Sequence, residues 1–333
     1  MRVLVTGGNG FLGTNLVSKL GSLDHDVVSF DSAPPRAQMS PGTRWIQGDL
    51  NDLSSIRSAY DESSPSLVFH LAARTDLHGR TIEDYAANTI GTDNLITVMK
   101  DAGNKPFTVY ASSRLVFAID HRPVHDYDYK PSTPYGESKV AMERRVRDGA
   151  SAAGDWALVR PTSLWGPWFG IPYRDFFDTV KSGRYVNVSL RSPSKSYGFV
   201  GNAVHELVAL AQAPREATHE KVFWLSDYPP LELRNWAELI ADEFGVKRPR
   251  TVPYWLIRLA AAAGDAAKQL GYSEPPITSF RLRNLLTNMV YDTSTTEAIV
   301  GPLPYSLNEG VSLTAEWIRS QQGSIVTPAA TDR

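Results

Sequence analysis

Tyr135 and Lys139 are the residues whose types and spacing point most directly to chemistry. They stand four apart in a segment that opens with Thr133 and Pro134, which suit a helix cap and a first helical position. The two side chains would therefore share one helix face. A phenol, with an ordinary pKa of about 10, is a weak base at neutral pH. A nearby ammonium group would lower that pKa, so the pair could take a proton from a hydroxyl group.

Ser113 adds a third polar group to this pair. It follows an expected strand at 107–111, and its hydroxyl could hold a substrate oxygen while Tyr135 moves the proton. A tyrosine and a lysine at this spacing usually form nothing more than a solvated helix face. Their interpretation as catalytic residues therefore depends on the elements around them.

The N-terminal stretch predicts an element that binds a pyrophosphate. Residues 2–6 suit a buried parallel strand, and glycines follow at positions 7, 10 and 13. A helical pattern begins there, with one apolar face made of Leu12, Leu16, Val17 and Leu20. A strand, a glycine turn and a helix N-terminus bring backbone N–H groups and a favourable dipole to the phosphates.

A carboxylate follows at the position that a dinucleotide site requires. The second expected strand, 26–31, ends in Asp31, about 20 residues beyond the glycines. An acid at this point binds a ribose 2′-hydroxyl group and repels a 2′-phosphate. The sequence therefore predicts NAD as the cofactor rather than NADP.

Strand and helix patterns alternate through the first half of the chain. Further strands are expected at 43–50, 66–73, 107–111 and 156–160, and helices at 52–60, at 81–102 and from Pro134. This rhythm predicts an α/β fold, a Rossmann-type doubly wound parallel sheet with helices on both faces. From Pro161 the pattern becomes less regular, with many prolines, glycines and aromatic residues.

We expect two domains and a tail. Residues 1–165 would form the NAD-binding Rossmann domain, joined by a returning strand near 221–225, and 166–322 a smaller, mostly helical, discontinuous substrate-binding domain. Residues 323–333 would form a loose tail. The apolar stripe of Trp255, Leu256, Leu259 and Ala263 is expected in the core of the second domain.

Composition excludes several classes of function. The chain has 333 residues, a formal net charge of −2 and no cysteine. This charge argues against a bulk nucleic-acid binder, and the lack of cysteine excludes disulfides, thiolate metal sites and a cysteine nucleophile. No metal is expected. The most apolar helix candidate, 253–270, is interrupted by Arg258 and Asp265, so no membrane association is expected. The first strand directly follows Met1, which favours the cytoplasm.

Together, these motifs resemble the extended short-chain dehydrogenase/reductases, of the NAD-dependent nucleotide-sugar epimerase/dehydratase kind. The resemblance covers nearly the whole chain. Its motifs occur in the family's order: residues 6–13, Gly48-Asp49-Leu50, His70-Leu71-Ala72-Ala73, Asn88 with Gly91-Thr92 and Asn94, Ser112-Ser113 with Val116-Phe117, 135–139, Arg160-Pro161 with Gly166-Pro167, and a closing pattern from Tyr291-Asp292 to Trp317.

The resemblance implies residue roles around the cofactor. Tyr135 would be the acid/base and Lys139 its partner, and Ser113, three residues before Val116, would take the catalytic serine position. His70 would only pack or bond locally. The cofactor-binding residues implied are Gly7, Gly10, Phe11, Leu12, Gly13, Asp31, Asp49, Leu50, Leu71, Ala72, Ala73, Asn88, Tyr135, Lys139 and Pro161.

The substrate half departs from the family pattern. Ser163 stands where epimerases often carry Asn, Trp165 where they carry Tyr, and Lys195 where an arginine holds the sugar-nucleotide phosphate. Lysine can meet a phosphate only as a point charge. The substrate-binding candidates are Arg74, Ser112, Ser113, Ser163, Trp165, Lys195 and Arg281.

The function implied is epimerisation or dehydration of a nucleotide-activated sugar by transient hydride transfer, in a homodimer. An alternative is an NAD(P)-dependent alcohol dehydrogenase or ketone reductase like the 3β-hydroxysteroid and flavonol-reductase branch. A remote alternative is a non-catalytic NAD-binding protein on the same fold.

Overall fold

The computed structural model describes residues 1–119, 121–189, 192–272, 275 and 277–323. The chain forms two compact units. The first contains Met1–Leu164, Val200–Tyr228 and Tyr291–Pro304, and the second contains Trp165–Phe199, Pro229–Val290 and the chain from Tyr305. The first unit thus takes back more of the later chain than the single strand expected near 221–225.

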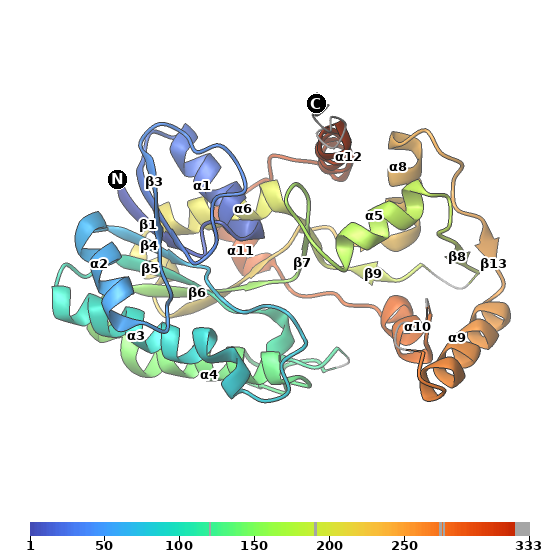
Figure 1. Cartoon of the computed structure of the whole chain (residues 1–333), viewed down its shortest axis with the longest axis horizontal. Coiled ribbons are helices and arrows are strands. Elements are labelled where there is room, and N and C mark those ends of the chain that lie inside the picture. Colours follow the sequence, from blue (N-terminus) through green and yellow to red (C-terminus); the bar gives the residue numbers. More distant parts are fainter. Residues whose placement is uncertain (120, 190–191, 273–274, 276, 324–333) are drawn as a thin grey trace, which may run out of the picture. The chain divides into compact units, whose positions relative to one another are not determined.

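A parallel sheet of seven strands forms the centre of the first unit (Figure 1). Its order is β11-β6-β5-β4-β1-β2-β3, and each pair of neighbouring strands in it is parallel. The strands are β1 (Arg2–Thr6), β2 (Asp26–Asp31), β3 (Thr43–Gln47), β4 (Leu67–His70), β5 (Phe107–Ala111), β6 (Trp156–Pro161) and β11 (Lys221–Leu225). The strand order reverses between β1 and β4, where α/β sheets bind ligands beyond the carboxyl ends. The predicted Rossmann-type fold is confirmed.

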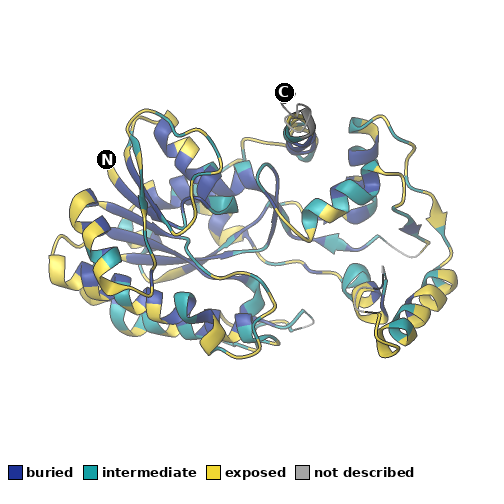
Figure 2. Cartoon of the chain, viewed as in Figure 1, coloured by how far each residue is buried: buried dark blue, intermediate teal, exposed yellow. Residues whose placement is uncertain are grey.

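Helices cover both faces of this sheet. One apolar cluster joins β1, β4 and β5 to α1 (Phe11–Ser22) and α6 (Val200–Gln212), with α11 (Ser294–Val300) packed against α6. The other cluster contains side chains of α2 (Leu53–Ser63), α3 (Ala86–Ala102) and α4 (Pro134–Gly149). The short α7 (Arg215–Thr218) precedes β11. Figure 2 shows the inner strands buried between these layers, whereas the edge strand β3 is only partly buried.

The start of α4 is fixed by the cap that the sequence predicts. Thr133 is extended, its hydroxyl accepts a hydrogen bond from Gly136 N at 3.0 Å, and Pro134 occupies the first turn. This cap places Tyr135 and Lys139 on consecutive turns of one helix face. Both side chains are buried.

The second unit is mostly helical. Its elements are α5 (Tyr173–Lys181), β8 (Asn187–Val188), β9 (Ser194–Lys195), β10 (Tyr197–Phe199), β12 (Leu231–Glu232), α8 (Leu233–Glu243), β13 (Thr251–Val252), α9 (Tyr254–Gln269), α10 (Ser279–Leu286) and α12 (Leu307–Gly323), and β7 (Ser163–Trp165) leads into it. Its core is aromatic: Trp165 lies against Phe177, Phe199 and Trp236, with ring centroids 5.3–5.8 Å apart. Trp165 is therefore a buried core residue, and its expected contact with the substrate stays a prediction.

Two further expectations differ from the structure or lie outside it. The stripe of Trp255, Leu256, Leu259 and Ala263 on α9 is exposed, so its assignment to the core was wrong. Of the expected tail, only its first residue, Gly323 at the end of α12, is described; 324–333 lie outside the described residues. Among the described residues, no helix is long and apolar enough to span a membrane, and no cluster of His, Asp and Glu side chains could hold a metal ion.

Candidate active site

The glycine turn after β1 brings the N-terminus of α1 against the strand ends. Gly7 N donates to Phe30 O at 2.8 Å, and a Cβ atom on Gly13 would lie 2.0 Å from Gly7 O. Only glycine at position 13 lets the helix approach this closely. The N-cap residue Gly10 contributes no side-chain cap. This uncapped helix N-terminus beside a turn fits a pyrophosphate.

Asp31 is held in place at the carboxyl end of β2. Its carboxylate accepts hydrogen bonds from Asn9 N at 3.0 Å and Ala33 N at 2.9 Å. Asn9, which the sequence analysis did not single out, accepts from Ser29 Oγ at 2.9 Å and donates to Ala33 O at 2.6 Å. The acid thus keeps a fixed position beside the glycine turn, which fits the predicted contact with an adenosine ribose.

The other predicted cofactor residues lie at or just beyond strand ends. Leu71 N donates to Thr6 O at 3.0 Å, and Asn94 Nδ2 donates to Leu50 O at 2.8 Å. Their common location is the carboxyl edge of the sheet, after β3 for Asp49 and Leu50, after β4 for Leu71, Ala72 and Ala73, and at the end of β6 for Pro161. Their contacts with NAD stay predictions.

The structure brings Ser113 and Tyr135 together. Ser113 caps a short 3₁₀ turn at 114–116, where its Oγ accepts from Leu115 N at 3.1 Å. Burial raises the pKa of Tyr135 to about 12, and its hydrogen bond with Ser113 opposes this effect. The direction differs from the lowered pKa that we expected, because burial outweighs any stabilisation of the phenolate by the protein's own groups. Tyr135 is therefore protonated at neutral pH.

Lys139 reaches across to the neighbouring strand. Its Nζ donates to Ala111 O, at the end of β5, at 2.9 Å. Burial lowers the pKa of Lys139 to about 8, and the carboxylate of Glu143, one turn further along α4, opposes that shift. The ammonium group therefore joins the helix of Tyr135 to the strand that leads to Ser113.

Glu143 is the centre of a buried polar network that the sequence analysis missed. Its carboxylate accepts from Arg160 Nε at 2.8 Å and Nη2 at 2.7 Å, from Ser112 Oγ at 2.5 Å and from Tyr129 Oη at 2.6 Å. Glu143 and Arg160 are both 0% exposed. Ser112, expected to contact the substrate, is instead bonded to this network. The position of Glu143 four residues after Lys139 was the available signal.

His70 links three elements in the core. Thr6 Oγ1 and His70 Nδ1 are 2.8 Å apart, and His70 Nε2 and Thr92 Oγ1 are 3.1 Å apart. Because Thr92 Oγ1 donates to Asn88 O, this network assigns the ring proton to Nε2. Burial lowers the pKa of His70 to about 3, so the ring is neutral. These bonds join β1, β4 and α3, so they reach further along the chain than the local bonding that the sequence analysis expected.

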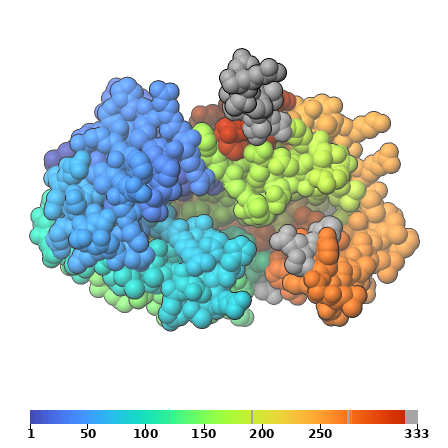
Figure 3. All heavy atoms as spheres, in the orientation of Figure 1, coloured from blue at the N-terminus to red at the C-terminus, as the bar shows by residue number. Residues whose placement is uncertain are grey.

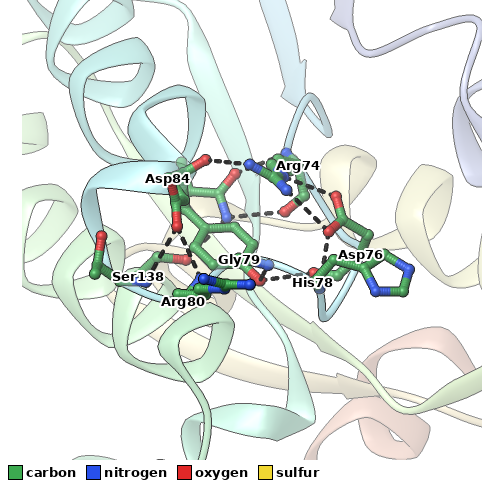
Figure 4. Close-up of polar contacts among 10 residues, drawn as sticks. Arg74, Asp76, His78, Gly79, Arg80, Asp84 and Ser138 are labelled. Carbon is green, nitrogen blue, oxygen red and sulfur yellow. Dashed lines mark hydrogen bonds and ion pairs between the residues drawn. The ribbon is translucent and has the colours of Figure 1, made fainter. Parts of the chain in front are cut away.

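Asn88 and Arg74 are joined to each other, and Figure 4 shows Arg74 between Asp76 and Asp84. Asn88 Oδ1 accepts from Arg74 N at 2.8 Å, and Asn88 Nδ2 donates to Arg74 O at 3.1 Å and Ser138 Oγ at 2.9 Å. The Arg74 guanidinium group binds both oxygens of Asp76 at 2.7 and 3.1 Å, and Asp84 O at 2.9 Å. Asn88, predicted to contact the cofactor, and Arg74, predicted to contact the substrate, are thus both bonded to other groups of the protein. Asn88 fixes the loop after β4 onto α4.

Lys195, the predicted phosphate-binding cation, is buried in the second unit. Lys195 is 1% exposed, and its Nζ donates to Asn284 O at 2.9 Å and to Thr287 O, at the C-terminal end of α10. This buried position does not fit its predicted contact with a diphosphate. Arg281 donates to Pro275 O at 3.0 Å. Ser163 Oγ is buried, without a hydrogen-bond partner among the described residues.

Comparison with known proteins identifies the family. Residues 3–225 match the model of the NAD-dependent epimerase/dehydratase family. The chain belongs to this family. NAD is therefore the cofactor to which the glycine turn and Asp31 are suited.

Similar proteins of this NAD-dependent family differ in activity. A 3 beta-hydroxysteroid dehydrogenase/Delta 5→4-isomerase of Mycobacterium tuberculosis is 30% identical over 266 residues, covering 75% of this chain and 71% of the relative. A 2-alkyl-3-oxoalkanoate reductase of Stenotrophomonas maltophilia is 28% identical, covering 93% and 97%. The UDP-glucose 4-epimerase of Thermotoga maritima has the same fold, with a TM-score of 0.74, 20% identity and coverage of 97% and 100%.

Replacing Asp31 by asparagine should weaken the preference of this family member for NAD. The variant would lose the predicted charge-assisted hydrogen bond to a ribose hydroxyl group, worth about 1.5–3 kcal/mol, and would no longer repel a 2′-phosphate. We expect the dissociation constant for NAD to rise about 10- to 100-fold, while NADP binding improves. Calorimetric titration of both cofactors measures this change. Unaltered selectivity would contradict the role of Asp31.

The pH profile of NAD-dependent turnover should report on Lys139. Burial disfavours its charged form, so the folded protein loses this proton near pH 8, well below the ordinary pKa of 10.5. Tyr135 is protonated both just below and just above pH 8. We therefore expect the rate at saturating NADH to be level below pH 8 and to decline above it. In Lys139→Arg, the decline should move to higher pH. An unchanged midpoint in that variant would assign the titration to another group.

Proposed function

We propose that this protein catalyses NAD-dependent interconversion of a secondary alcohol and a ketone on an apolar substrate. The observation that carries the proposal is the grouping of Ser113, Tyr135 and Lys139 at the carboxyl edge of the sheet, beside the glycine turn and Asp31. This grouping supports proton transfer at an oxygen next to a cofactor that exchanges hydride.

In the proposed mechanism, Ser113 and Tyr135 both hydrogen-bond the substrate oxygen. Bound NADH supplies the hydride for the carbonyl carbon, and NAD accepts it in the reverse direction. Tyr135 gives its phenolic proton to the oxygen during reduction and recovers a proton afterwards. Its pKa of about 12 keeps it protonated at neutral pH, which favours reduction, whereas oxidation should accelerate as pH rises. Lys139 holds α4 against β5, so that the phenol and the serine stay in register.

The position of Lys195 favours an apolar substrate over a nucleotide sugar. Its ammonium group is buried against two carbonyl groups of the chain, where a diphosphate would have to displace both bonds. The relatives at 28–30% identity are named for a hydroxysteroid and a 2-alkyl-3-oxoalkanoate. These names support a hydroxy or keto group on a largely apolar molecule.

The family match favours a second candidate, the nucleotide-sugar epimerase or dehydratase that the sequence motifs implied. The same three residues would remove the proton from a sugar hydroxyl, and the hydride would return to the sugar carbon in the product. This candidate requires a diphosphate-binding group other than Lys195.

We also propose the homodimer that the resemblance implies, formed through α3 and α4. Ile90, on α3, is an apolar side chain that is 50% exposed, as such a contact requires. Light scattering of the purified protein, with Ile90→Glu as the disrupting variant, tests this assembly.

A substrate panel separates the two candidates. The purified protein is incubated with NADH and either 3-ketosteroids or 3-oxo fatty acids, and in parallel with NAD and UDP-, GDP-, CDP- or dTDP-sugars. We expect NADH consumption with an apolar ketone, and loss of that consumption in Tyr135→Phe. A ligand at a hundred times its dissociation constant also stabilises the protein by about 2.7 kcal/mol. Thermal stabilisation and epimerised product with one nucleotide sugar alone would overturn the apolar-substrate proposal.

A further inference from the structure

The outward side of α9 is apolar. At 3.6 residues per turn, one face of the helix and its C-terminal cap contains only apolar residues, all of them exposed: Trp255, Leu256, Leu259, Ala262, Ala263, Ala266 and Leu270. Trp255 and Leu259 are each 61% exposed, and Leu270 is 88% exposed. We refer to these seven residues as the α9 apolar face. Figure 2 shows α9 largely in the colour of exposed residues.

The opposite side of α9 is packed, which fixes the rotation of the helix. Ala261 is fully buried, and a Cβ atom on Gly264 would lie 1.9 Å from Ile277 O. The segment before α10 therefore lies directly against this side of the helix, and only glycine allows that approach. The exposure of the α9 apolar face is a consequence of this packing. Amphipathic helices of globular proteins normally bury their apolar side.

Basic side chains outnumber acidic ones on α9 and α10. On α9, Arg258 borders the apolar face, whereas Lys268 lies on the packed side with Ala261 and Gly264. The exposed cationic residues of α9 and α10 are Arg258, Lys268, Arg281 and Arg283. Asp265 is the one acidic residue of the two helices, and its carboxylate accepts a hydrogen bond from Ser279 N at 3.1 Å, at the start of α10. Phe280 and Tyr272 add aromatic rings that are each 61% exposed. In Figure 3, atoms of this segment (orange) lie at the molecular surface.

We propose that the α9 apolar face rests on an anionic phospholipid surface, with the helix parallel to the membrane plane. An apolar helix face with cationic neighbours and a tryptophan is typical of helices that lie in the lipid interface. The 16 residues of α9 extend about 24 Å, and no described helix is suited to span a bilayer, so the contact is peripheral. The sequence analysis expected no membrane association because Arg258 and Asp265 interrupt 253–270, and it placed the apolar stripe in the core.

Charge complementarity favours lipid over a second copy of the chain. In a two-fold contact through this face, Arg258 at its border and the net positive charge of α9 and α10 would approach their counterparts in the other copy, and like charges oppose association. Anionic headgroups instead attract these positive charges. The apolar side chains would enter the boundary between headgroups and acyl chains.

Vesicle binding by the full-length protein tests the proposal. The protein is floated with vesicles of phosphatidylcholine alone or of phosphatidylcholine with phosphatidylserine. We expect binding to the anionic vesicles, weakened by salt and reduced at least about tenfold in Trp255→Ser/Leu259→Ser. Arg281→Glu/Arg283→Glu should lose the preference for anionic vesicles. The matched control is Leu77→Ser, which removes a side chain that is 58% exposed in the first unit.

Two outcomes would overturn the proposal. One is equal recovery of the protein with and without vesicles. The other is a change of oligomeric state in Trp255→Ser/Leu259→Ser, measured by light scattering, without vesicle binding by the unaltered protein, which would identify the occupant as a second copy. Circular dichroism and thermal melting of each variant ensure that a loss of binding does not reflect unfolding. None of these readouts depends on the proposed enzymatic activity.

Discussion

Replacing Tyr135 by phenylalanine should lower kcat by about 10²- to 10⁴-fold without weakening NAD binding, because the variant lacks only the hydroxyl that moves the proton. The ring still fills its buried site, where it lies 5.8 Å from the ring of Tyr85. The hydrogen bond with Ser113 is lost. Steady-state rates with the substrate identified by the panel, together with a titration of NAD, measure the two effects separately.

Tyr60→Phe is the matched control for this substitution. Tyr60 is also buried in the first unit, and its Oη bonds Asn104 Oδ1 at 2.5 Å, away from the residues proposed to act on the substrate. We expect a small loss of stability and an unchanged kcat. Tyr135→Phe with full activity would contradict the proposed mechanism, and equal losses in the two variants would indicate a general structural effect.

Replacing Glu143 by glutamine should destabilise the fold by about 3–5 kcal/mol. The amide keeps the shape of the side chain but leaves the buried guanidinium group of Arg160 with only the exposed carboxylate of Asp126, 3.8 Å away, as a counter-charge, and such a loss is costly. The melting temperature should fall by about 5–15 °C. Because Glu143 raises the pKa of Lys139, its removal should also move the decline of the pH profile below pH 8. Calorimetry and the pH profile measure these two effects.

An exposed ion pair between α3 and α4 provides the comparison. Arg145 Nε lies 2.8 Å from Asp93 Oδ2, with both side chains more than a third exposed. Asp93→Asn should change stability by less than about 1 kcal/mol. Replacing Glu143 and Arg160 together by methionine should cost less than Glu143→Gln, because no buried charge then lacks a partner. If Asp93→Asn and Glu143→Gln cost the same, the buried pair has no special role.

The elements that position the site were predictable because each has a strong local signal. The glycine turn, the strand ending in Asp31 and the cap at Thr133 each depend on a few neighbouring residues, and the structure contains all three. Boundaries were less predictable. The strand expected at 66–73 ends at His70, where the chain continues as an irregular segment fixed by Asn88.

Side-chain partners that come from distant parts of the chain were not predictable, because they depend on tertiary packing. Lys195 has the sequence position of a phosphate ligand, but α10 brings two carbonyl groups to its ammonium group. The α9 stripe has the period of a core helix, but the packing at Gly264 turns it outward. Glu143 was missed because its partners Arg160, Ser112 and Tyr129 lie on separate segments.

The discontinuous course of the first unit affects how the protein is made. Its last strand, β11, and its helices α6 and α11 follow long segments that belong to the second unit. A nascent chain ending at residue 164 would leave the β6 edge unpaired and the apolar side chains covered by α6 open to water. The ribosome must therefore release residue 304 before this unit can close. Until then, its unpaired strand edge and open apolar surface favour aggregation.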